Sequence, residues 1–108
     1  MIRLLYVSTG LANLDYKDVS AILEAAQRKN ATKNITGALA YNGKNFAQVL
    51  EGSEADIDKL MRKIKDDSRH ANVIEMMRKP ITERAYSDWS MKMIDSKDFD
   101  ELIAAMTL

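Results

Sequence analysis

The sequence predicts an α+β fold in which two helices cover one face of a five-stranded mixed sheet. Two segments carry apolar residues at helical spacing, and five short runs are rich in β-branched, aromatic and other apolar residues. The pair Asn42-Gly43 joins two of these runs, as in a tight hairpin. The resulting order, β-α-β-β-α-β-β plus a C-terminal helix, is typical of a ferredoxin-like sandwich.

The first strand is predicted over Ile2–Val7, where apolar residues form an almost continuous run. Asp15 then precedes a helix as its N-cap, with Asp18 as an acidic residue in the first turn. Asn30 continues the apolar register of this helix, so a polar amide is expected at the end of its buried face. The apolar positions are Val19, Ile22, Leu23 and Ala26, which follow the i, i+3, i+4, i+7 spacing.

The two hairpin strands are "ITGALAY" and "NFAQVL". Side chains alternate along a strand, so Gln48 shares one face with Phe46 and Leu50. A buried amide without hydrogen-bond partners costs about 1–3 kcal/mol. Gln48 therefore needs a specific partner.

Ser53 is predicted to cap the second helix, with Asp56 at its third position, and this helix should end near residues 66–70. Strands follow at 72–81 and 87–94, and residues 97–108 form a short amphipathic helix. In the last strand, one face is expected to carry Trp89, Met91 and Met93.

The first two helices cover only one face of the predicted sheet. The tail helix or a second subunit is expected to cover the other face, so a homodimer is one option. The chain of 108 residues is long enough for one domain, with 46% apolar and 30% charged residues.

Composition excludes several functional classes. Lys and Arg total 16, as do Asp and Glu, so net charge gives no general attraction to nucleic acid or acidic lipid. There is no Cys, which excludes disulfides and thiol catalysis, and a single His argues against a metal site. The first apolar run is too short for a signal sequence or membrane span, and we expect a cytoplasmic location.

Three polar residues lie among apolar neighbours: Tyr6, Asn30 and Gln48. First and third strands are central neighbours in a ferredoxin-like sheet, which would bring Tyr6 beside Gln48, under the first helix. A phenol and two amides include no strong acid or base, so they are poorly suited to hydrolysis. They are well suited to hold a flat heteroaromatic ring with amide-like edges, and Tyr6 could pass an electron or a proton.

Each of these residues also has an ordinary structural explanation. A strand Tyr is usually part of the core, and an Asn near a helix end is a common C-cap. Trp89 and Met91 are core residues by default, while Arg69 and His70 after a helix are usually solvated or cap it. No single residue carries a functional assignment.

Five stretches together resemble one family. They are "RLLYVS", "QRKNATKNITGALAY", "FAQVLEG", "DDSRHANV" and "ITERAYSDWSM". In this order and spacing they resemble the BLUF family, blue-light sensors that use FAD, over nearly the whole chain. The resemblance implies a non-enzymatic photosensor domain at residues 1–95, with residues 96–108 as a C-terminal cap or output helix.

The resemblance also implies roles for individual residues. Tyr6 matches the photoactive tyrosine and Gln48 the switch glutamine between Tyr6 and the flavin. Trp89 and Met91 match the pair linked to signal output. The cofactor-binding residues that it implies are Ile22, Lys29, Asn30, Gln48, Asp67, Arg69 and His70.

The implied mechanism is a reversible switch. Blue light excites the flavin, and Tyr6 supplies an electron followed by a proton. The radical pair then recombines, which leaves the flavin oxidised and slightly red-shifted, with Gln48 in a new hydrogen-bonding state. The last strand would carry the signal to a partner or fused effector of unknown identity. FAD is the expected cofactor, with FMN as the alternative.

The chain departs from the family pattern at a few positions. Asn34 stands where glycine is frequent, which fits because Asn tolerates left-handed backbone conformations. Ala38, Ala40 and Ala47 are smaller than the side chains often found there. None of these departures affects Tyr6, Asn30 or Gln48.

The residues alone leave open two alternative functions from other classes of protein. One is a flavin-free interaction module on the same fold. The other is an acylphosphatase-like enzyme that would use Arg69 and Asn30, although a glycine-rich phosphate loop is missing after the first strand.

Overall fold

The computed structural model describes residues 1–11, 14–88, 90–94 and 99–108. These residues form one five-stranded sheet in the order β4-β1-β3-β2-β5, which is antiparallel except for the parallel pair β2 and β5. The predicted α+β, ferredoxin-like arrangement is confirmed. In chain order the elements are β1 (Ile2–Gly10), α1 (Tyr16–Thr32), β2 (Thr36–Tyr41), β3 (Asn45–Gly52), α2 (Glu54–Lys65), β4 (His70–Pro80), β5 (Lys92–Ile94) and α3 (Asp100–Ala105).

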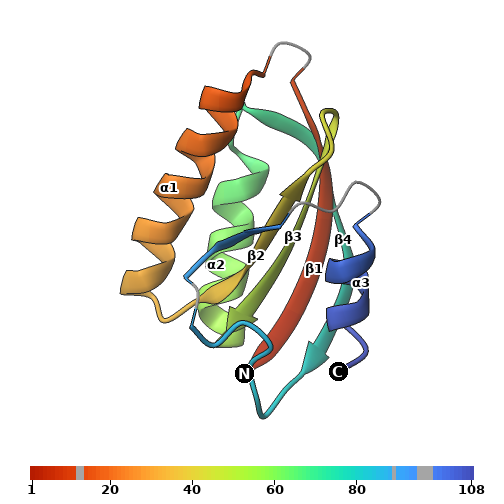
Figure 1. Cartoon of the computed structure of the whole chain (residues 1–108). Helices are drawn as coiled ribbons and strands as arrows, with labels where there is room; N and C mark the ends of the chain where they lie inside the picture. The colour runs from red at the N-terminus through yellow and green to blue at the C-terminus, as the bar shows by residue number, and fades with distance from the viewer. Residues whose placement is uncertain (12–13, 89, 95–98) are drawn as a thin grey trace.

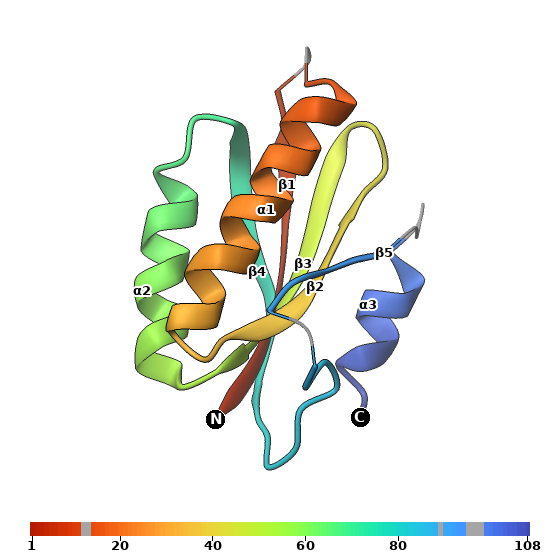
Figure 2. The same ribbon diagram turned by 60° about the vertical axis from the view of Figure 1, so that its left-hand side comes forward.

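Helices α1 and α2 lie side by side on one face of the sheet, and α3 lies on the opposite face (Figures 1 and 2). The tail helix α3 therefore packs on the second face of the sheet, which was one of the two options expected from the sequence. Leu102 and Ala105 of α3, and Met106 directly after it, are buried in one cluster with Leu5 and Val49 of the central strands. Both chain ends lie at the same end of the sheet (Figure 1).

Local sequence signals set the ends of the helices. The Asp15 carboxylate accepts from the Asp18 N–H at 2.9 Å, and the Asp18 carboxylate accepts from the Asp15 N–H at 3.0 Å. Ser53 caps α2 by accepting from the Asp56 N–H at 3.2 Å. After α1, Asn34 has a φ of 55°, the left-handed conformation for which Asn was expected to substitute for glycine.

The hairpin between β2 and β3 turns at Asn42 and Gly43, as predicted. The Asn42 side chain accepts from the N–H groups of Lys44 and Asn45 at 3.0 and 2.7 Å. Gly43 has a φ of 95°, which a residue without Cβ adopts at little cost. This hairpin fixes the register of β3, and with it the position of Gln48.

Strand β5 is shorter than the sequence predicted. A strand was expected at 87–94, but only Lys92–Ile94 pair with β2, and Ser87 and Ser90 lie in turns or bends. The chain comes alongside β2 only after Met91, which is fully buried in the core on the α1 side. The apolar residue Met91 therefore marks core packing before the strand, and Met93 lies in the strand itself. Trp89 lies outside the described residues.

The edge strand β4 leaves large apolar side chains in solvent. Ile74, Met76 and Met77 are 54%, 56% and 45% exposed. Helix α3 therefore covers the central strands and leaves this edge open. Among the described residues, no helix has the length and apolar character needed to cross a membrane.

Candidate functional site

A cavity of about 120 Å³ lies where α1 and α2 face the central strands. Two further hollows share residues with it, one of about 20 Å³ at Tyr6 and one of about 200 Å³ at Asn30. Seven of the residues predicted from the sequence line the central cavity: Tyr6, Ile22, Lys29, Asn30, Gln48, Asp67 and Arg69. The fold thus brings together residues from β1, α1, β3 and the segment after α2.

Tyr6 and Gln48 lie opposite each other on β1 and β3. The Tyr6 hydroxyl donates to Gln48 Oε1, and Gln48 Nε2 donates to Met91 Sδ at 3.2 Å. All three side chains are at most 5% exposed. The amide of Gln48 is thus satisfied at both ends, which removes the cost of burying it.

The Tyr6 hydroxyl stays protonated at physiological pH. Burial, and secondly the negative charge of Asp67, raise the pKa of Tyr6 far above its ordinary value of about 10. A neutral phenol can donate to Gln48 Oε1, whereas a phenolate could only accept.

Asn30 closes the cavity at the end of α1 and is only 2% exposed. Its Nδ2 donates to the Ser90 carbonyl at 3.2 Å, so this residue is more than a helix cap. One turn earlier, Gln27 Nε2 donates to the Met91 carbonyl at 3.1 Å. Together these two amides tie α1 to the segment that enters β5.

The Gln27 contact was not predicted from the sequence. The available signal was its position three residues before Asn30, which places both side chains on one side of the helix. The α2 residues of the wall, Leu60, Lys63 and Ile64, were also missed as site residues, because a helix stripe with one lysine is typical of any amphipathic helix.

Asp67 and Arg69 form an ion pair at the rim of the cavity. Arg69 Nη2 lies 2.6 Å from Asp67 Oδ2, and the two side chains are 41% and 27% exposed for Arg69 and Asp67. The hydrogen bond to Asp67 is the main cause that raises the pKa of Arg69. Of His70, the structure describes only the backbone, which begins β4 and pairs with Gly10.

The chemistry of the residues that line the cavity suits a flavin ring. Ile22, Leu60 and Ile64 give apolar walls, and the amides of Asn30 and Gln48 can pair with ring atoms that donate and accept. Lys29, Lys63 and Arg69 add positive charge suited to a phosphate-bearing tail.

Residues 1–92 match the BLUF family, described as sensors of blue light using FAD. The chain belongs to the BLUF family. It is a blue-light sensor domain, and its cofactor class is a flavin. This membership replaces the acylphosphatase-like alternative. The residues that match include both strands of the Tyr6–Gln48 pair and both cavity helices.

Similar proteins include the photoactivated adenylate cyclase subunit beta of Euglena longa. It is 39% identical over 89 residues, which cover 82% of this chain and 10% of that protein. The blue light- and temperature-regulated antirepressor BluF of Escherichia coli K12 is 29% identical over 92 residues, 83% of this chain and 23% of that one. The BLUF chain thus spans about a tenth of the length of the cyclase subunits that it matches.

Solved structures agree with the fold. The dark state of the BLUF protein BlrB superposes with a TM-score of 0.84 at 34% identity, covering 95% of this chain and 78% of that one. A bacterial light-regulated adenylyl cyclase gives a TM-score of 0.82 at 34% identity, covering 99% of this chain and 31% of that chain.

Proposed function

We propose that this BLUF domain binds FAD in the cavity between α1 and α2, and that Gln48 is the residue whose hydrogen bonds change on illumination. The observation that carries this proposal is the pair of unlike partners at the two ends of one amide. Gln48 accepts from the Tyr6 hydroxyl and donates to the Met91 sulfur.

The two partners respond differently to a reversal of the amide. A flavin, when bound, supplies blue-light absorption and an electron-accepting ring. Tyr6 would be the electron donor, and its hydroxyl proton has an acceptor already in place at Gln48 Oε1. Return of the electron and the proton to Tyr6 would restore the phenol, so that only the hydrogen bonds of Gln48 differ at the end. A thioether sulfur can accept a hydrogen bond but has no proton to donate. Rotation of the Gln48 amide, with or without tautomerisation, turns Nε2 away from Met91 and therefore breaks that bond. One of the side-chain hydrogen bonds that hold the entry to β5 is then lost.

The polar residues of the cavity hold the cofactor. Asn30 would bond the polar edge of the ring, Lys29 would lie beside it, and Ile22 would pack on its face, since all three line the cavity. Arg69 would bind the phosphate next to the ribityl chain. Asp67 and His70, which flank Arg69 in the sequence, would contribute to the same part of the site. FAD is favoured over FMN by the description of the family.

The output follows from the position of Met91. Residues 1–95 form the sensor, and residues 96–108 form the cap through which Met91 and Trp89 pass the signal to a downstream protein or fused effector. Relatives named as photoactivated adenylate cyclase subunits support an effector of this general kind.

An absorption spectrum before and after blue light tests the switch. The parent protein loaded with FAD is expected to shift slightly to the red and to recover in darkness. Gln48→Leu has a similar volume but no amide, so it should bind FAD without the shift. Gln27→Leu is the matched control, because it removes an amide that bonds the Met91 carbonyl but has no contact with Tyr6, and it should keep the shift. An unchanged photocycle in Gln48→Leu would contradict the proposal.

The phosphate role of Arg69 has a separate test. Arg69→Ala should lower the affinity for FMN, because a charge-assisted hydrogen bond is lost. Its affinity for riboflavin, which has the same ring but no phosphate, should stay close to that of the parent. Titration of the apoprotein by flavin fluorescence measures both constants, and equal losses for the two ligands would remove Arg69 from the phosphate site.

A further inference from the structure

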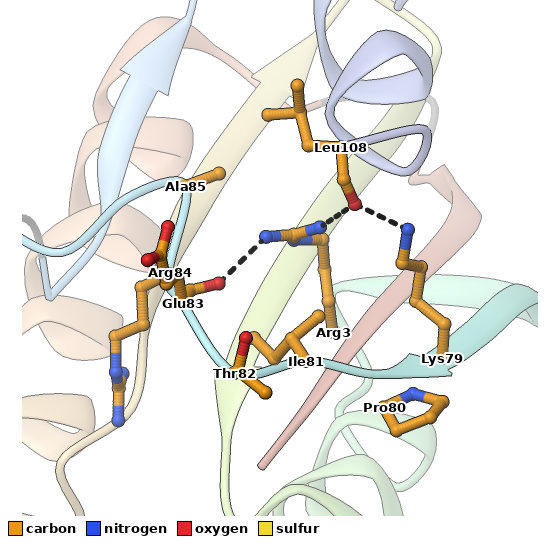
Figure 3. A pocket seen from close by; sticks show the side chains of 9 residues that line it. All are labelled: Arg3, Lys79, Pro80, Ile81, Thr82, Glu83, Arg84, Ala85 and Leu108. Carbon is orange, nitrogen blue, oxygen red and sulfur yellow. Dashed lines mark hydrogen bonds between the residues drawn. The ribbon is translucent and has the colours of Figure 1, made fainter.

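Arg3 lies at the centre of a network on the α3 side of the sheet. Its Nε donates to Glu51 Oε2 at 2.8 Å, and both side chains are at most 3% exposed. Its Nη1 donates to the carbonyls of Ala105 and Leu108, and its Nη2 to that of Glu83, each at 3.2 Å. Figure 3 shows the guanidinium between Glu83 and Leu108 at the edge of a hollow of about 690 Å³.

Glu51 extends this network to the segment before β5. Its carboxylate accepts from the N–H groups of Ala85 and Tyr86, both at 2.8 Å. Tyr86 is buried in the same cluster as Leu102 and Met106 of the α3 region. One buried ion pair thus fixes both the end of α3 and the segment that leads towards Met91.

The ion pair shares its two strands with the switch. Arg3 is the register partner of Glu51 and Tyr6 that of Gln48, so the two pairs lie three residues apart on one ladder. Three residues correspond to about 10 Å and to opposite faces of the sheet. A displacement of β3 against β1 at Gln48 therefore reaches Glu51 through continuous backbone pairing.

Helix α3 is suited to respond because it is short and begins without a side-chain cap. It has only six residues, too few to be stable as an isolated helix. Its N-cap residue Phe99 has a φ of 63° and makes no side-chain capping bond, so the helix starts from a strained conformation. Arg3 bonds the carbonyl of Ala105, the last residue of α3, and Lys79 bonds those of Met106 and Leu108 just after it. With the buried side chains of Leu102, Ala105 and Met106, these bonds keep α3 on the sheet.

We propose that Arg3 and Glu51 are positioning residues that couple the hydrogen-bond state of Gln48 to the attachment of α3. This inference rests on the proposed function of Gln48. In darkness the guanidinium holds the carbonyls of Ala105 and Leu108. In the light state a shifted β3 draws Glu51, and Arg3 with it, away from those carbonyls, and α3 detaches from the sheet. Arg3 keeps its hydrogen bond to the Glu51 carboxylate and loses those to the two carbonyls, because a bond between opposite charges is the stronger one.

Hydrogen exchange on the whole FAD-loaded chain tests the coupling. Blue light should speed exchange of the α3 amides by about fivefold or more, the lower end of ordinary coupling between two sites. Glu51→Gln keeps the shape and an acceptor oxygen but removes the charge. It should show the parent's red shift, while the light-to-dark ratio of α3 exchange falls close to one.

Two further variants separate coupling from simple support. Lys79→Gln removes the other cation at the end of α3, bonded to Met106 and Leu108 but absent from the β1–β3 ladder. It should speed exchange equally in darkness and light, so its ratio stays that of the parent. Arg3→Lys keeps the charge but cannot form the same fork of bonds, and it should lower the ratio even if Glu51→Gln does not fold.

The outcomes are distinct. A parent that shows the red shift but no faster α3 exchange in light overturns this inference and leaves the proposed function standing. The inference is also overturned if Glu51→Gln and Arg3→Lys both keep the parent's light-to-dark ratio of α3 exchange, since the ion pair would then only support the structure. A parent with bound FAD and no red shift would overturn the proposed function, and this inference with it.

Discussion

The central ladder of β1 and β3 carries two very different pairs of side chains. On the face covered by α1 and α2, Tyr6 and Gln48 are neutral, and Gln48 has a sulfur as its second partner. On the α3 face, Arg3 and Glu51 are oppositely charged and bind several backbone groups. A neutral amide can exchange its donor and acceptor ends at small cost, whereas a buried ion pair cannot lose a partner cheaply. The ladder thus combines a changeable pair with a fixed one.

The fixed pair should show the largest effect on stability. Glu51→Ala leaves the Arg3 charge buried without its partner, which lowers the free energy of unfolding by about 3–5 kcal/mol. Urea unfolding measures this loss. Glu83→Ala is the control, because its side chain is exposed and only its carbonyl contacts Arg3, so little change is expected. Equal losses in the free energy of unfolding for Glu51→Ala and Glu83→Ala would mean that the ion pair is not the stabilising contact described here.

The neutral pair should instead appear in the pH dependence of stability. Folding raises the pKa of Tyr6 above its ordinary value of about 10. The full contribution of Tyr6 to the free energy of unfolding is therefore present below about pH 10, and it declines above that pH. From about pH 9 to about pH 11.5, the parent should lose about 2 kcal/mol more than Tyr6→Phe. Urea unfolding at both pH values compares the two proteins. Parallel losses would mean that Tyr6 is not held protonated by burial.

Met91→Leu should have the smallest effect on stability. Leu has a similar volume, so the free energy of unfolding should change by less than about 1.5 kcal/mol. The donor end of Gln48 loses its sulfur acceptor, however, so the rate of dark recovery after blue light should change. Recovery followed by absorption checks this. An unchanged rate would show that the Met91 contact does not stabilise either state of the amide.

Local signals explain why the changeable pair could be predicted from the sequence. Tyr6, Asn30 and Gln48 are polar residues at positions where strand or helix periodicity expects apolar ones, so they pointed to a shared buried site. The hairpin at Asn42-Gly43 and the cap at Asp15 fixed their registers. The resemblance then assigned a cofactor to this site, which periodicity alone could not do.

The fixed pair was not predicted, for an equally physical reason. Arg3 and Glu51 stand near the ends of apolar runs, and a charged residue there is usually exposed to solvent. They are buried because α3 returns to the sheet, and the Arg3 bond to Ala105 spans 102 residues of sequence. The predicted start of β5 was also wrong. Met91 is apolar because it is buried in the core, and its spacing in the sequence looked like that of a strand residue.

The most direct test of the central claim is an infrared difference spectrum between light and dark, recorded with ¹³C-labelled glutamine side chains. The chain contains two glutamines, so the variant Gln27→Leu leaves Gln48 as the labelled amide. The account predicts a pair of carbonyl bands that moves to lower frequency on labelling, because the hydrogen bonds of Gln48 differ between the two states. A normal red shift in visible absorption without any label-sensitive band would contradict it.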